Sequence, residues 1–152
     1  MESLDPRVRL AWVVGALVPG AVIAAVAVGA ARIGAPVPLT GALAFAAAVV
    51  TLGLIAAVYR YRVWRFEVRE DSLFIVRGVL TRVDTSVPYV RVQHVDTRRG
   101  PLERALGLAS VVVYTAGSRG ADITIPGLTP ARAGELRERL RELATESEFD
   151  AV

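Results

Sequence analysis

Two long runs without a charged residue dominate the first third of the chain. They cover residues 10–31 and 37–58, 22 residues each. An α-helix rises about 1.5 Å per residue, so each run spans about 33 Å, close to the thickness of a bilayer's hydrocarbon core. The first run could instead belong to a cleaved signal peptide, but it is longer than the usual apolar segment of one, and a second run follows almost at once. The sequence therefore predicts a transmembrane hairpin over residues 10–58.

Arginines near the ends of the hairpin predict its orientation. Five lie just outside the two runs: Arg7, Arg9, Arg60, Arg62 and Arg65. The connecting turn carries Arg32 alone. Because basic residues are retained on the cytoplasmic side of a membrane, we expect a multi-pass protein of the plasma membrane with both termini in the cytoplasm. Residues 1–9 would then form a cytoplasmic N-terminal tail.

Basic and aromatic residues around the end of the second run are typical of a membrane–water interface. We expect five of them to lie among the lipid headgroups: Arg60, Tyr61, Arg62, Trp64 and Arg65. The arginines either set the topology alone or also attract anionic lipids, in which case each contributes about 1 kcal/mol near such a surface. The sequence leaves both interpretations open.

Small residues recur at four-residue spacing within both runs. They are Ala21, Ala25 and Gly29 in the first run, and Gly53 and Ala57 in the second. Such stripes let helix backbones approach closely, although an alanine-rich sequence also produces them by chance. Neither run contains an ionisable residue, so nothing in them indicates a proton relay or an ion path.

The residue types exclude several kinds of chemistry. The chain has no cysteine, one histidine (His94) and no lysine, because all 18 of its basic residues are arginine. Thiolate metal sites, cysteine nucleophiles, Schiff-base lysines and Walker-type phosphate binding therefore lack their essential residues. The net charge of +3 is too small for a nucleic-acid-binding domain. We expect no metal, no cofactor and no nucleic-acid partner.

Beyond the hairpin the apolar residues begin to alternate with polar ones, which is typical of half-buried strands. Trp64, Phe66 and Val68 alternate with charged residues and predict a first strand that contributes to a core. Further strands are predicted over residues 73–77, 79–85, 91–97, 109–115 and 122–125. A short helical turn is predicted over 102–106, and a glycine-rich loop over 116–120.

A C-terminal helix completes this second part of the chain. Thr129 is a good N-cap and Pro130 suits the first helical position. One apolar face follows at helical spacing: Ala133, Leu136, Leu140 and Leu143. We predict a mainly-β domain over residues 60–144, built as a strongly bent sheet or open barrel and capped by this helix, with a flexible tail over residues 145–152.

Several motifs in this part resemble one family. They are Val87-Pro88-Tyr89-x-Arg91-x-Gln93-x-Val95, Gly100-Pro101-Leu102-x-Arg104-x-Leu106-Gly107-Leu108 and Thr115-Ala116-Gly117. With paired apolar helices ahead of them, they resemble the bacterial pleckstrin-homology-like (YdbS-like) membrane proteins, and the resemblance covers nearly the whole chain. It implies a pleckstrin-homology-type (PH-like) barrel and no enzymatic activity. It also implies work beside a larger membrane partner that carries several similar domains.

Polar residues in or near these motifs are the candidate partner-binding residues: Arg91, Gln93, Arg98, Arg99 and Arg104. They form either a binding edge for another domain or, for Arg91 and Gln93, hydrogen bonds that stabilise a neighbouring loop. His94 has no surrounding catalytic motif. The turn that binds inositides in eukaryotic relatives is Glu70-Asp71 here, which would repel phosphate.

These residues favour a non-catalytic, membrane-anchored interaction module. Its expected partners are the lipid bilayer and either a second copy of the chain or a larger PH-like membrane protein. The alternative is a sensor of anionic lipid surfaces that acts through the arginines next to the membrane.

Overall fold

The computed structural model describes residues 1–117 and 122–150. The chain divides into two compact units. One unit consists of residues 9–60, and the other combines residues 1–8 with the chain from Tyr61 onward. The glycine-rich loop predicted over residues 116–120 therefore lies mostly outside the described residues.

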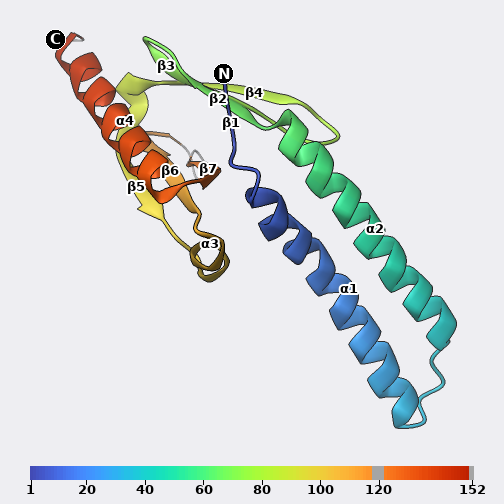
Figure 1. Cartoon of the computed structure of the whole chain (residues 1–152). Helices are drawn as coiled ribbons and strands as arrows, with labels where there is room; N and C mark the ends of the chain where they lie inside the picture. The colour runs from blue at the N-terminus through green and yellow to red at the C-terminus, as the bar shows by residue number, and fades with distance from the viewer. Residues whose placement is uncertain (118–121, 151–152) are drawn as a thin grey trace. The chain divides into compact units, whose positions relative to one another are not determined.

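The first unit is a pair of long apolar helices, α1 (Val8–Arg32) and α2 (Leu39–Val63), each of 25 residues (Figure 1). Both are long enough and apolar enough to cross a membrane. The two predicted helices are confirmed, and each extends beyond its uncharged run to include flanking arginines. The helices are not limited to the uncharged runs, because the absence of charge marks only the part that is suited to lipid. The backbone hydrogen bonds of a helix continue into the charged flanks.

Small residues hold α1 and α2 together. A Cβ added at Gly53 would lie 2.7 Å from the Cβ of Ala16, and one added at Gly20 would overlap the side chain of Val50. Of the two interpretations of the small-residue stripes, close packing applies to α2, where Gly53 meets Ala16 and Ala57 is buried. In α1 the stripe residues Ala21, Ala25 and Gly29 are exposed, as expected for spacings that arise by chance. A helix that is apolar all round carries no polar face to mark the side that meets its partner.

The second unit contains two antiparallel sheets, which Figure 1 shows with the C-terminal helix. The strand order is β1-β2-β3-β4 in the first sheet and β5-β6-β7 in the second. The first sheet comprises β1 (Glu2–Ser3), β2 (Arg65–Val68), β3 (Ser72–Arg77) and β4 (Val83–Pro88). A short 3-10 helix, η1 (Tyr89–Arg91), leads into the second sheet. The remaining elements are β5 (Val92–Arg98), α3 (Pro101–Leu106), β6 (Ala109–Thr115), β7 (Ile123–Leu128) and α4 (Pro130–Asp150).

Two sheets closed by a helix confirm the predicted mainly-β, PH-like architecture. The main difference in strand bounds is β4, which begins at Val83 rather than at residue 79. Gly78 has a φ of +112°, and a Cβ there would collide with the carbonyl of Thr81. A glycine in this backbone region permits a turn that other residues cannot adopt, so the chain turns after β3 instead of continuing as a strand.

The core lies where the two sheets and α4 meet. Phe66, Leu73 and Ile75 are almost fully buried, as alternation along their strands predicts. Val111 is also fully buried, within a strand whose first five residues are all buried. The predicted apolar face of α4 is also confirmed, because all four of its members are buried. Thr129 caps the helix as expected, since its hydroxyl oxygen accepts a hydrogen bond from the backbone N–H of Arg132.

Tyr89 is a polar member of this core. Its ring is buried, and its hydroxyl donates a 2.7 Å hydrogen bond to the carbonyl oxygen of Arg69. Burial raises the pKa of this phenol, because a low-dielectric environment disfavours the charged form. The link ties the end of the first sheet to the turn between β2 and β3.

The first eight residues, which we expected to form a cytoplasmic N-terminal tail, belong to the second unit. Glu2 and Ser3 pair with Phe66 and Arg65 of β2, and the backbone N–H of Asp5 donates a 2.7 Å hydrogen bond to the carbonyl of Gly127 in β7. The segment therefore joins the two sheets. The side chain of Leu4 is 1% exposed, so it fills a site in the core.

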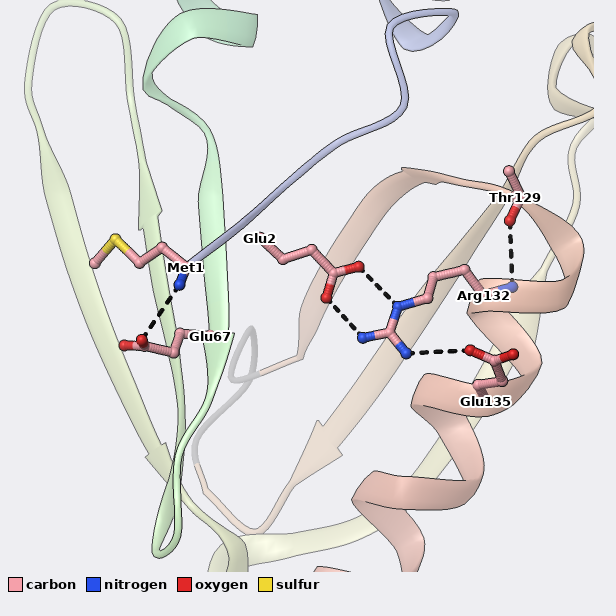
Figure 2. Close-up of polar contacts among 6 residues, drawn as sticks. All are labelled: Met1, Glu2, Glu67, Thr129, Arg132 and Glu135. Atoms are coloured by element: carbon pink, nitrogen blue, oxygen red, sulfur yellow. Dashed lines mark hydrogen bonds and ion pairs between the residues drawn. The ribbon is translucent and has the colours of Figure 1, made fainter.

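Ion pairs fix the same segment to other elements (Figure 2). The Glu2 carboxylate accepts two hydrogen bonds from the Arg132 guanidinium of α4, at 2.7 and 2.6 Å, and the N-terminal amine lies 3.3 Å from Glu67. These bonds to Arg132 lower the pKa of Glu2 and raise that of the guanidinium. Sequence patterns did not indicate them because residues 2 and 132 are far apart in the chain.

The C-terminal segment also differs from expectation. We predicted a flexible tail from residue 145, but α4 continues to Asp150. The hydroxyls of Thr145 and Ser147 donate hydrogen bonds to the carbonyls of Arg141 and Leu143, one turn earlier in the helix. These side chains therefore take part in the helical turn rather than ending it.

Candidate interaction surface

The outer edge of the second sheet is the most distinctive feature of this unit. β5 is one of the two terminal strands of this sheet and pairs only with β6. Among the described residues, no other strand bonds to its second edge. Such an edge presents unpaired N–H and C=O groups that can pair with another chain.

One face of β5 carries a cluster of polar and aromatic side chains. Directly opposed residues of an antiparallel pair project to the same face, and His94 lies opposite Tyr114 of β6. Their rings stack with centroids 4.1 Å apart. Two residues further along, Asp96 lies 3.9 Å from His94, between the Nε2 and Oδ2 atoms. Arg98 follows and donates a hydrogen bond to the Tyr114 hydroxyl.

A groove of about 500 Å³ lies between β5 and α4. β5 contributes one wall and α4 the other, with these lining residues: Val92, Gln93, His94, Val95, Arg137, Arg141, Ala144 and Thr145. The strand pairing shifts between Val92 and His94, so Gln93 sits at a bulge. Bulges bend a strand and redirect its side chains, which here brings Gln93 to the groove beside two arginines of α4.

The structure places the predicted partner-binding residues on three neighbouring elements. Arg91 ends η1, Gln93 and Arg98 lie in β5, Arg99 follows that strand, and Arg104 lies in α3. All five side chains are exposed. Only Gln93 and Arg98 take part in the groove and the ring cluster, respectively.

Four further residues of this surface were not among the predicted ones: His94, Tyr114, Arg137 and Arg141. The stack of His94 on Tyr114 depends on the register of β5 with β6, which no local pattern reveals. The two arginines stand one helical turn apart on α4, a spacing that places them on one face. That spacing was the available sequence signal.

The residues expected at the membrane surface take different places. Within the helical pair, the Arg60 guanidinium lies 4.5 Å from the centroid of the Trp12 ring, a cation–π arrangement. In the other unit, Tyr61 donates a 3.3 Å hydrogen bond from its hydroxyl to the carbonyl of Leu4. Arg62 is exposed.

Trp64 and Arg65 are engaged by the protein itself. The Trp64 side chain is 3% exposed and meets Phe66 edge to face, so it packs in the core instead of lying among headgroups. Alternation along β2 puts both rings on the inner side. Arg65 donates hydrogen bonds to the carbonyls of Tyr61 and Trp64, at 3.1 and 2.7 Å, and thereby satisfies acceptors at the end of α2.

The groups at this surface are strand-edge, guanidinium and aromatic groups. Within residues 1–117 and 122–150, no three histidine, aspartate or glutamate side chains gather as metal ligands would. The surface offers strand hydrogen bonds, guanidinium donors and a stacked ring pair. Such groups recognise another polypeptide or an anionic group.

The fold defines a PH-like domain that follows two apolar helices of membrane-spanning length. Comparison with known proteins gives the family: a model described as the bacterial PH domain matches residues 8–144, and the chain belongs to that family. The chain is 38% identical over 110 residues to the UPF0699 transmembrane protein YdbS of Bacillus subtilis (strain 168), a match that covers 72% of this chain and 67% of the relative. No solved structure matches. The chain is thus a membrane-associated PH-like protein, and its helices associate with the lipid bilayer.

Proposed function

We propose that this protein is a non-catalytic, membrane-anchored module that assembles with a second copy or with a larger membrane protein bearing similar domains. The observation that carries the proposal is the unpaired outer edge of β5. Strand addition to such an edge uses main-chain hydrogen bonds for affinity and neighbouring side chains for specificity.

The side chains around the edge favour a selective partner. Charged residues on an edge strand oppose indiscriminate pairing, and Asp96 and Arg98 of β5 are exposed. Arg91, just before the strand, is exposed as well. The groove adds two more arginines from α4, Arg137 and Arg141. A strand with acidic residues at its flanks would complement this surface.

Membrane attachment supports this role by limiting where the edge can meet a partner. The segments on both sides of the helical pair belong to one compact unit, an arrangement that favours both termini on the same side of the membrane. Arginines flank the hairpin while the connecting turn carries only one, which favours the cytoplasmic side. A partner in the same membrane then meets the edge in two dimensions, which raises its effective concentration.

The experiment that tests the proposal is purification of the full chain from its native membranes in mild detergent, with the mass of the particle measured by light scattering. We expect a complex of defined composition. The double variant Arg91→Glu/Arg98→Glu should lose the partner. Arg69→Glu, a charge reversal at an exposed position between β2 and β3 and away from the groove, should retain it. A particle that contains one copy and no partner would contradict the proposal, as would a complex insensitive to the double variant.

A second candidate function is sensing of an anionic lipid surface, supported by the exposed Arg62 beside the membrane helices. Its test is the binding of the purified protein, reconstituted in nanodiscs of neutral lipid, to vesicles that contain phosphatidylglycerol. Binding that is abolished by Arg62→Gln would support sensing. Equal binding to neutral vesicles would contradict it.

A further inference from the structure

An unusual turn connects β3 to β4. The turn covers residues 78–82, and its centre is Val79-Leu80. Tight turns normally carry glycine, proline, asparagine, aspartate or serine. Here the Leu80 side chain is 101% exposed, and Val79 and Val83 are 39% and 42% exposed. Single exposed apolar side chains are common on protein surfaces, but here three of them are neighbours at one tip, so they form an exposed apolar patch.

The tip has a fixed shape. Gly78 adopts a φ of +112°, and a Cβ at this position would collide with the Thr81 carbonyl. At the base of the tip, Arg77 pairs with Val83 across the two strands. The backbone therefore presents Leu80 outward from the end of an ordered hairpin.

Strand register shows at which end of the sheet this tip lies. Arg65, the first residue of β2, is paired with Val76 near the end of β3, and the strands can be followed in Figure 1. The tip extends past this pair, at the end where β2 begins. Since α2 ends at Val63, two residues separate Arg65 from that helix, a distance of at most about 7 Å along the chain.

From these observations we propose that residues 78–82 form a second membrane contact, with Leu80 and Val79 inserted into the interfacial layer of the same bilayer that holds α1 and α2. Arg77 and Arg82 flank the apolar pair and are exposed, although Arg82 also pairs with Asp84 at 3.0 Å. Apolar side chains bordered by arginines suit an interface, because the guanidinium groups remain among the headgroups while the apolar groups enter the acyl region.

This contact restricts rotation of the PH-like domain about the short link after α2. Two attachment points, the helix end and the tip, hold one end of the first sheet at the lipid. The opposite end carries the turn Glu70-Asp71, whose acidic side chains an anionic surface would repel. The proposal is independent of whether β5 binds a partner.

The experiment uses the full chain, which has no cysteine, so that one introduced thiol takes a single label. A bimane fluorophore is attached at Leu80→Cys, or at Val90→Cys as the matched control. Val90 is also apolar and exposed, but it follows Pro88, which pairs with Ser72 at the opposite end of the same sheet. Each protein is reconstituted singly into nanodiscs of phosphatidylcholine and phosphatidylglycerol, with or without lipid that carries a nitroxide near the headgroup.

We expect the label at position 80 to lose fluorescence when the nitroxide lipid is present, and the label at position 90 to keep it. No quenching at position 80 would overturn the proposal, and so would equal quenching at both positions. The proposal would also be overturned if the label at position 80 became shielded from solvent only when each nanodisc held two copies, because the tip would then bind protein rather than lipid.

Discussion

Truncation of Leu4 tests whether the segment before the membrane hairpin belongs to the core of the PH-like domain. The Leu4 side chain is 1% exposed, and its neighbours are held in place by β1 pairing and by the bond from Asp5 to Gly127. Replacing a fully buried leucine with alanine removes its transfer free energy and leaves a cavity, which together cost about 3 kcal/mol. We therefore expect Leu4→Ala to lower the free energy of unfolding of the domain by about that amount.

The assay uses the intrinsic fluorescence of Trp64, which is buried and so reports unfolding of this unit. Trp12, the other tryptophan, is replaced by phenylalanine in all proteins, which are unfolded with urea in mild detergent. For a urea dependence of about 1.5 kcal/mol per M, the expected loss moves the midpoint down by about 2 M.

Leu102→Ala is the matched control because it makes the same chemical change at an exposed position of α3. A surface substitution of this kind changes the free energy of unfolding by less than about 1 kcal/mol. If Leu4→Ala shifted the midpoint no more than Leu102→Ala does, the first eight residues would contribute nothing to the core, and the reasoning would be refuted.

Three further predictions concern stability. Pairing with Arg132 lowers the pKa of Glu2, so this pair stabilises the fold above the ordinary carboxyl pKa and ceases to do so as the pH falls through the lowered value. Glu2→Gln should therefore cost up to about 1 kcal/mol at pH 7 in urea titrations, and the cost should shrink as the pH falls below the ordinary carboxyl pKa. A cost that stayed constant with pH would contradict this. Gly127→Ala should cost more than about 2 kcal/mol in the same assay, because its φ is +64° and its Cβ would lie 2.6 Å from that of Val8. Gly134→Ala, at an open position of α4, should cost nothing, and equal costs at the two positions would contradict the clash. Gly53→Leu should disrupt the α1–α2 contact, so a cysteine introduced at that contact should react faster with a thiol label. Gly15→Leu, at an open position, should leave that labelling rate unchanged.

A prediction for the candidate interaction surface follows from the ring stack. His94→Ala removes an exposed aromatic contact with Tyr114, so it should cost at most about 1 kcal/mol in the urea assay. Because His94 lies beside the unpaired edge, the substitution should weaken assembly more than it lowers stability. Assembly is measured as the fraction of complex recovered in detergent. Retention of the full complex would argue that the ring pair lies outside the contact.

The sequence by itself determined the parts of this protein that depend on neighbouring residues. Uncharged runs marked both apolar helices, alternation marked the inner faces of the strands, and helical spacing marked the buried face of α4. Each of these patterns involves residues that are close in the sequence, within one or two helical turns or along one strand. It can therefore be recognised without knowledge of the rest of the fold. The motifs near Tyr89 and Gly107 also indicated the family, and the match over residues 8–144 establishes it.

Only the tertiary structure decided which distant segments meet. Glu2 binds Arg132, 130 residues later, and Leu4 fills a core to which no sequence pattern connects it. The tertiary structure also decided the place of Trp64, because an aromatic side chain suits both a headgroup layer and a core. It likewise decided the contact of His94 with Tyr114, which depends on strand register. The physical reason is that such contacts depend on how sheets and helix close around one core, and local periodicity contains no information about that closure.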